Sequence, residues 1–186
     1  MPYSRILVST ERLEQIASCL ARKIHDAYQG VDNCLALVVL DGAKYFAEDL
    51  LAQLDFPLEV ESIKASSYSG IHSTGTVTID KKDALKSKIR GKNVLLIDDI
   101  YDTGLTLSRI LGWLDDCRPQ SVRTCVLLEK EIGHTKKTTI DFLGTKIEDV
   151  FAIGYGLDYA GQYRELPFIG ELSEERIGRN EPDCKA

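Results

Sequence analysis

The chain has 186 residues, of which 44% are hydrophobic and 28% charged, as in a globular domain with a sizeable core. Its net charge of −6 argues against nucleic acid as a partner, and no apolar run approaches the ~20 residues that a membrane-crossing helix needs. The N-terminus has no signal-peptide pattern and the five cysteines lack metal-ligand spacing, so we expect reduced thiols, no membrane partner and a cytoplasmic location.

The first third of the chain predicts a helix, a strand and a second helix. Thr10 is placed to cap the first helix, and apolar residues at helical spacing continue as far as Ala27. Residues 34–40 form a continuous apolar run, typical of a strand buried on both faces. Asp41, Gly42 and Ala43 follow it and lead into a helix. Such a turn suits an anion, although the pattern alone fits any strand-to-helix turn equally well.

The next segment predicts a hairpin. Residues 58–63 have a strand pattern, residues 65–75 are small, polar and punctuated by glycine, and residues 76–79 favour a strand again. The Lys-rich stretch from residue 81 to residue 92 is expected to be solvated surface.

The stretch from Asn93 to Leu107, NVLLIDDIYDTGLTL, is the most informative in the chain. Four apolar residues predict a buried strand, and two acids, Asp98 and Asp99, end it. Asp102 or Thr103 can cap the helix that follows, and Gly104 allows a close approach of the backbone to a ligand. A strand, a loop and a helix N-terminus in this order predict a phosphate site, in which the acids would meet hydroxyls or a metal ion.

The last third predicts a strand over residues 121–128, with Lys130 directly after it, and another that opens at about residue 149 and ends in Asp158. Considered alone, each of these residues has an ordinary structural explanation. Lys130 can be a solvated surface charge, Phe151 can be an aromatic residue of the core, and Asp158 can be an acid in a turn.

Taken together, these segments resemble one family. NVLLIDDIYDTGLTL resembles the ribose-phosphate signature of the type I phosphoribosyltransferases. VVLDGAKYFAEDLL and VFAIGYGLDYAGQYRELPFIGEL resemble the pyrophosphate loop and the purine-site segment of the hypoxanthine phosphoribosyltransferases in their short bacterial form. The resemblance runs from about Val38 to Leu172, in four motifs in the right order.

The resemblance implies an α/β fold with a mainly parallel sheet flanked by helices, a small C-terminal hood and a flexible hairpin lid. It implies one phosphoribosyltransferase domain over residues 1–186, with a core at about 31–150, a lid at 65–79 and a purine-binding hood segment at about 149–172. A homodimer or homotetramer is expected on the same basis.

The implied activity is transfer of the 5-phosphoribosyl group from 5-phosphoribosyl 1-pyrophosphate (PRPP) to N9 of hypoxanthine or guanine, which gives IMP or GMP and pyrophosphate in purine salvage. The residues implied to bind the phosphoribosyl group are Asp98, Asp99, Ile100, Tyr101, Asp102, Thr103, Gly104, Leu105 and Thr106. Those implied for pyrophosphate are Asp41, Gly42, Ala43 and Arg164. Many relatives have lysine where this chain has Asp41, which places a side-chain contact to pyrophosphate in question at that position.

Purine binding is implied for Lys130, Phe151, Ala152 and Asp158, and a role in the lid for Ser67 and Tyr68. Mg²⁺ is the implied cofactor, with Asp98, Asp99 and Asp158 as candidate ligands. Asp102 is the implied catalytic residue, either as a general base or as a hydrogen-bond acceptor for the proton on purine N7.

Two other classes of function remain open at this point. A regulator built on the same fold would sense PRPP or nucleotides and bind nucleic acid, but the acidic charge and the intact purine-site segment argue against it. A phospho-acceptor signalling domain also gathers acids at strand ends, but it has no use for the Asp-Thr-Gly-x-Thr sequence.

Overall fold

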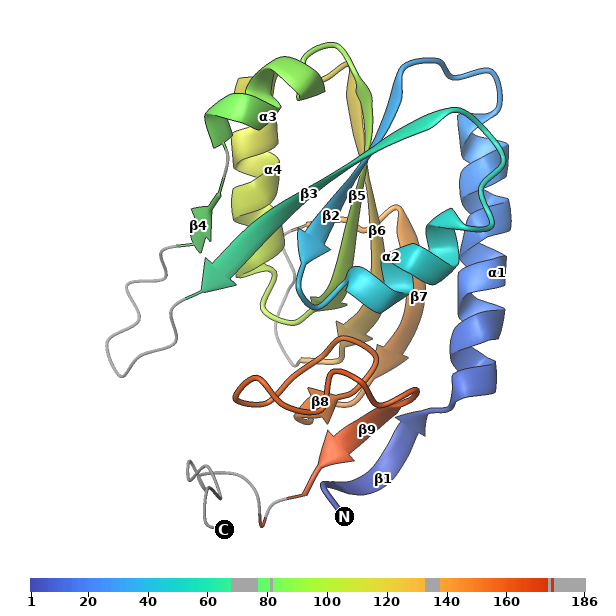
Figure 1. The fold of residues 1–186 in the computed structure, drawn as a ribbon, viewed down its shortest axis with the longest axis vertical. Helices are drawn as coiled ribbons and strands as arrows, with labels where there is room; N and C mark the ends of the chain where they lie inside the picture. Colours follow the sequence, from blue (N-terminus) through green and yellow to red (C-terminus); the bar gives the residue numbers. More distant parts are fainter. Residues whose placement is uncertain (68–76, 81, 133–137, 174, 176–186) are drawn as a thin grey trace, which may run out of the picture.

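The computed structural model describes residues 1–67, 77–80, 82–132, 138–173 and 175. Within this part, six strands form one sheet in the order β4-β3-β2-β5-β6-β7 (Figure 1). All of its pairings are parallel except that between β3 and the short edge strand β4. The strands are β2 (Cys34–Leu40), β3 (Leu58–Ser67), β4 (Val77–Ile79), β5 (Asn93–Tyr101), β6 (Ser121–Lys130) and β7 (Phe142–Ile147).

Helices cover both faces of this sheet. The helices α1 (Thr10–Tyr28) and α2 (Lys44–Leu51) lie on one side, and α3 (Lys82–Ile89) and α4 (Leu105–Cys117) on the other (Figure 1). Residues of β2 alternate between the two cores: Ala36 and Val38 pack with α1 and α2, whereas Leu35 and Leu37 pack with α3 and α4. The mainly parallel α/β fold expected from the sequence is therefore confirmed.

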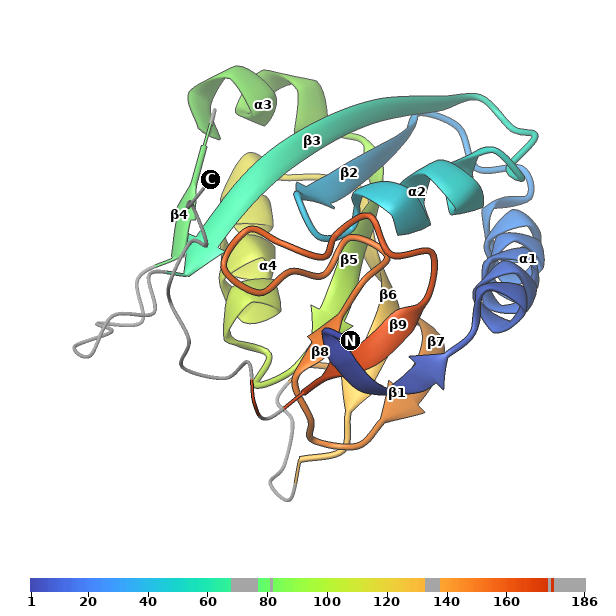
Figure 2. The same ribbon diagram turned by 60° about the horizontal axis from the view of Figure 1, so that its bottom comes forward.

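A second, smaller sheet lies across the carboxyl ends of the large one (Figures 1 and 2). It pairs β1 (Tyr3–Val8), β9 (Ile169–Leu172) and β8 (Ala152–Ile153) in the order β1-β9-β8. The expected hood is present, but both ends of the chain build it rather than the C-terminal segment alone. The sequence did not predict β1, because most of this strand is exposed and its apolar run covers only residues 6–8. The strand expected to open at about residue 149 is only the two-residue β8.

Several local expectations are corrected. Ser9, not Thr10, caps α1, since its Oγ accepts a hydrogen bond from the Arg12 backbone N–H at 3.3 Å. The Thr10 hydroxyl instead donates to the Pro167 carbonyl at 2.8 Å, which ties α1 to the hood segment. The stretch 81–92 is not plain surface, because α3 forms within it and buries Leu85 and Ile89 against α4.

The cap of α4 also differs from the expectation. The N-cap is Gly104 in the left-handed conformation (φ 78°), not Asp102 or Thr103. A Cβ at residue 104 would lie 2.7 Å from ring atoms of Tyr101, so glycine satisfies both the backbone angle and the close approach.

The pairing of β3 with β4 forms the base of the expected hairpin, with Ser67 opposite Val77. Tyr68 and the rest of the predicted lid, up to residue 76, lie outside the described residues. No described helix is long and apolar enough to cross a membrane.

Candidate active site

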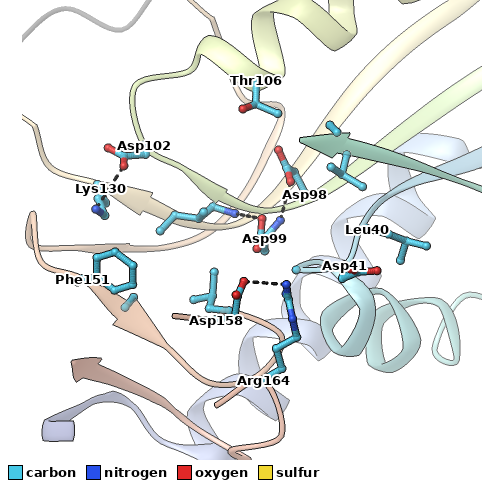
Figure 3. Close-up of a pocket in the computed structure, with 16 residues that line it drawn as sticks. Leu40, Asp41, Asp98, Asp99, Asp102, Thr106, Lys130, Phe151, Asp158 and Arg164 are labelled. Atoms are coloured by element: carbon cyan, nitrogen blue, oxygen red, sulfur yellow. Dashed lines mark hydrogen bonds and ion pairs between the residues drawn. The ribbon is translucent and has the colours of Figure 1, made fainter. Parts of the chain in front are cut away.

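A cavity of about 370 Å³ opens between the carboxyl ends of β2, β5 and β6 and the hood (Figure 3). A ligand site is expected at this edge of a parallel sheet. Among the residues expected at a site, the lining contains Asp41, Gly42, Asp98, Asp99, Ile100, Asp102, Thr106, Lys130, Phe151, Ala152, Asp158 and Arg164. Val39, Leu40, Ala65 and Leu157 also line it and were not singled out from the sequence.

Other expected residues lie around the cavity without lining it. Ala43 and Tyr101 are buried and support the loops on either side. Tyr101 lies beneath Gly104, and its hydroxyl accepts a hydrogen bond from the Thr138 backbone N–H at 3.3 Å. Thr103 and Leu105 belong to the loop and first turn of α4, where the Leu105 N–H lies 3.4 Å from the Thr103 hydroxyl.

Two adjacent acids, Asp98 and Asp99, form the floor of the cavity at the end of β5. Asp98 is only 4% exposed, and one of its oxygens accepts from the Asp99 backbone N–H at 3.0 Å. Burial raises the pKa of Asp98 well above its ordinary value, and the charge of Asp99 raises it further. Burial also raises the pKa of Asp99. A pair of adjacent acids with raised pKa values in a cavity is typical of a functional site.

The turn after β2 contacts this acid pair directly. A Cβ on Gly42 would overlap Oδ2 of Asp99, and a Cβ on Gly156 would lie 2.0 Å from the Gly42 carbonyl oxygen. Gly156 has a φ of +102°, in the range that favours glycine. The two glycines thus let the turn after β2 pack between β5 and the hood.

Lys130 lies at the other end of the cavity, between two carboxylates. Its Nζ is 3.3 Å from an oxygen of Asp102 and 3.5 Å from an oxygen of Asp149. The lysine side chain is only 13% exposed, whereas both carboxylates are about half-exposed or more. The Lys130 ammonium group thus lies at the cavity wall, next to Asp102. Asp149 was not predicted, because nothing in its sequence context distinguishes it from a turn acid.

Phe151 stands next to Lys130 and faces the cavity (Figure 3). The residue is 43% exposed, unusual for a phenylalanine, and its ring meets Tyr159 edge-on at a centroid distance of 5.2 Å. The following residue, Ala152, is buried in β8. The alternative of a core aromatic at residue 151 is wrong, and the exposed face of the ring is free to stack on a flat ligand.

Asp158 and Arg164 come from the hood and pair at 2.7 Å. The Arg164 guanidinium also donates to the Gly156 carbonyl at 2.7 Å, and the second oxygen of Asp158 accepts from the Gly161 N–H at 2.7 Å. These bonds hold both side chains at the cavity wall near Asp99 and opposite Lys130 (Figure 3).

The chemistry of the lining suits a hydrated magnesium ion that is bound together with a phosphorylated substrate. Asp98, Asp99 and Asp158 all reach the cavity, but no group of three or more metal-ligating side chains forms a closed cage in the described part of the chain. Mg²⁺ in proteins commonly uses one or two carboxylates, waters and substrate phosphate oxygens, so an open arrangement is compatible with it.

Comparisons with known proteins identify the family of this chain. The model of the phosphoribosyl transferase domain family matches residues 5–160. The hypoxanthine-guanine-xanthine phosphoribosyltransferase of Tritrichomonas foetus is 41% identical over 171 residues, which cover 91% of this chain and 92% of that protein. The chain therefore belongs to the phosphoribosyl transferase domain family.

Comparisons with solved structures show which members of this family the chain is similar to. A hypoxanthine phosphoribosyltransferase from Staphylococcus aureus has a TM-score of 0.82 and 34% identity, with 94% of each chain covered. A variant of the Trypanosoma cruzi hypoxanthine phosphoribosyltransferase, complexed with the product IMP, has a TM-score of 0.84 and 32% identity, with 97% of each chain covered. Within its family, the chain belongs with the hypoxanthine phosphoribosyltransferases, as the sequence motifs predict.

Proposed function

We propose that the protein transfers the 5-phosphoribosyl group from PRPP to N9 of hypoxanthine or guanine, with release of pyrophosphate. The observation that carries the proposal is the arrangement of Lys130, Asp102 and Phe151 in one cavity with the two acids at the end of β5. A cation donor, an acceptor and an exposed aromatic ring suit a 6-oxopurine. Asp98 and Asp99, at the other side of the cavity, suit the hydroxyls of a sugar and a metal ion.

At the sugar, the carboxylates of Asp98 and Asp99 accept hydrogen bonds from the ribose hydroxyls. The 5′-phosphate lies against the loop from Asp102 to Thr106, where the backbone N–H groups at the start of α4 and the dipole of this helix favour an anion. Ile100 and Tyr101 support this loop. Bond breaking leads toward an oxocarbenium-like state at the sugar, which a fixed cradle stabilises without reorganisation.

At the pyrophosphate, the backbone of Asp41, Gly42 and Ala43 and the planar guanidinium of Arg164 are the proposed contacts. Bound Mg²⁺ would neutralise charge on the leaving group, with Asp98, Asp99 and Asp158 as its candidate protein ligands. The ion pair with Asp158, which holds the Arg164 guanidinium at the cavity wall, supports this assignment.

At the purine, Phe151 stacks on the ring and Lys130 donates to O6. That donor selects 6-oxopurines over adenine, because the N6 amino group of adenine is itself a donor. The backbone of Ala152 and the side chain of Asp158 contact the remaining polar edge of the purine. Asp102 accepts the N7 proton, either as a general base or as a hydrogen-bond acceptor.

We further propose a single domain over residues 1–186 that works in the cytoplasm as a homodimer or homotetramer. Ser67 and Tyr68 would belong to a lid, which this reaction needs because water would capture the electron-deficient sugar in an open site. The similar Trypanosoma cruzi enzyme has been studied for the role of its C-terminal region in oligomeric state and activity.

Turnover measured with PRPP, Mg²⁺ and hypoxanthine, guanine, xanthine or adenine tests the proposal. We expect nucleotide formation with hypoxanthine and guanine and none with adenine. Tight PRPP binding with no product from any base would instead favour the regulator hypothesis. The named relatives, which are transferases, do not support that hypothesis.

A further inference from the structure

The lining of the cavity is acidic for a site that takes a polyanionic substrate. It contains five acids, namely Asp41, Asp98, Asp99, Asp102 and Asp158, and two bases, Lys130 and Arg164. Both bases already contact carboxylates, Lys130 at the purine end and Arg164 in the hood. Further cationic charge near the pyrophosphate would offset this excess.

Asp41 is the acid whose position most needs an explanation. It lies in the turn after β2, at the end of the cavity opposite Lys130 and Phe151 (Figure 3). The backbone of this turn is the proposed contact for pyrophosphate. An uncompensated carboxylate at that point would repel the leaving group by direct charge interaction.

Lys64 compensates this carboxylate. Its Nζ is 3.2 Å from Oδ1 and 3.5 Å from Oδ2 of Asp41. The sheet register fixes the pair, because β2 and β3 are parallel neighbours with Leu40 opposite Lys64. The Lys64 backbone N–H also donates to the Asp80 carboxylate at 2.8 Å, which holds the end of β3.

The two side chains are 61% and 49% exposed, and an ion pair this exposed contributes little to stability. The position of this ion pair says more about its role than its contribution to stability does. Asp41, its partner, and Ala65, its neighbour in β3, both line the cavity, so Lys64 lies beside the cavity rim although it does not itself line the cavity. An exposed lysine with a long, flexible stem can reach an anion that enters beside Asp41.

We propose that Lys64 is a cation for the pyrophosphate group in this protein, and that Asp41 positions its ammonium at the cavity mouth. The inference rests on the proposed function and deepens it. In the free protein the ammonium contacts Asp41. When PRPP binds, the ammonium contacts the pyrophosphate as well and offsets the carboxylate. Lys64 is thus a binding residue, and Asp41 is a positioning residue.

The test uses Lys64→Met, Asp41→Asn and the charge exchange Asp41→Lys with Lys64→Asp. The matched control is Lys88→Met, because Lys88 also pairs with an acid of β3, Glu61, but Glu61 does not line the cavity, whereas Asp41 does. The readouts are the KM for PRPP, the KM for hypoxanthine, inhibition by pyrophosphate and the melting temperature.

We expect Lys64→Met to raise the PRPP KM and the pyrophosphate inhibition constant by about tenfold, the value of one charge-assisted hydrogen bond. The hypoxanthine KM and the melting temperature should stay near those of the wild type. The charge exchange should restore much of the PRPP affinity, because a lysine again stands beside the pyrophosphate. Lys88→Met should leave all four values unchanged.

The inference is overturned if Lys64→Met changes both pyrophosphate-related constants by less than about twofold, a negligible free energy. It is also overturned if the charge exchange binds PRPP no better than Lys64→Met. Failure of the proposed function looks different, since the wild type would then form no IMP. In that case calorimetric titration with inorganic pyrophosphate and Mg²⁺ still compares Lys64→Met with the wild type.

Discussion

A Cβ atom built on Gly42 lies 1.8 Å from Oδ2 of Asp99, so the turn after β2 reaches the acid pair of β5 because residue 42 has no side chain. The two strands are parallel neighbours, and their carboxyl ends meet at the same edge of the sheet. This contact places the turn that is proposed to bind pyrophosphate against the two acids that are proposed to bind the ribose.

Gly42→Ala should therefore impair the site. Either Asp99 or the turn must move, and we expect kcat/KM for PRPP to fall by about tenfold or more, because small misplacements in a site are costly. Steady-state kinetics and thermal melting check this. The matched control is Gly112→Ala in α4, where an added Cβ meets nothing within 4 Å. The control should keep full activity and gain about 0.5–1 kcal/mol in free energy of unfolding from helix propensity. Unchanged PRPP kinetics in Gly42→Ala would contradict the proposed geometry.

Much of this arrangement could be predicted from the sequence. The apolar runs of β2 and β5 indicate buried parallel strands, and the acids that follow them must then lie at one sheet edge. Phe151 and Lys130 required the family resemblance, because each has an ordinary explanation when considered alone.

Other features could not be predicted because they depend on tertiary contacts. The pairing of Lys64 with Asp41 follows from the register of β2 and β3, which no local pattern reveals. The strand β1 is mostly exposed and forms because β9 supplies its hydrogen-bond partners. The glycine cap of α4 depends on Tyr101 beneath it, whereas sequence preference favours Asp102 or Thr103.

Asp102→Asn separates catalysis from binding. Asparagine keeps the size of the side chain but cannot take a proton, and general acid–base groups contribute about 10²–10⁴-fold. We expect kcat to fall by roughly that factor while the PRPP KM changes little. A near-normal kcat would contradict the role of Asp102 in handling the N7 proton. Loss of activity solely through PRPP binding would contradict it too, and would show that Asp102 is a structural member of the phosphate loop.

Phe151→Ala tests the purine end. Stacking of a base on an aromatic ring contributes about 1–3 kcal/mol, so the hypoxanthine KM should rise by about tenfold or more while the PRPP KM stays nearly constant. Val60→Ala is the control, because Val60 is also an exposed apolar side chain but does not line the cavity. If both variants gave the same hypoxanthine KM as the wild type, Phe151 would have no role in base binding.

Asp98→Asn should stabilise the metal-free protein while it impairs function. The folded-state pKa of Asp98 is raised, so the folded protein holds this proton to higher pH than the unfolded chain does. The contribution of Asp98 to stability is therefore lost as pH rises from about 4, the value in an unfolded chain, through the folded pKa. Asparagine does not titrate, so the variant should melt at a higher temperature than the wild type at pH 8, with a smaller difference near pH 4.

The same variant should show a raised PRPP KM or a weaker dependence on Mg²⁺, since the contacts proposed for Asp98 exist before the transition state. The exposed Asp116→Asn serves as the control and should show neither effect. A lower melting temperature for Asp98→Asn at pH 8 would contradict the proposed cost of burying this charge.

A cavity that joins a purine to a phosphoribosyl group must release both the nucleotide and pyrophosphate. Purified protein is mixed with PRPP, hypoxanthine and Mg²⁺, and IMP and pyrophosphate are quantified over time. We expect equal amounts of the two products over many turnovers, and loss of both when Mg²⁺ is chelated. Absence of IMP from a folded preparation that binds PRPP would contradict the account.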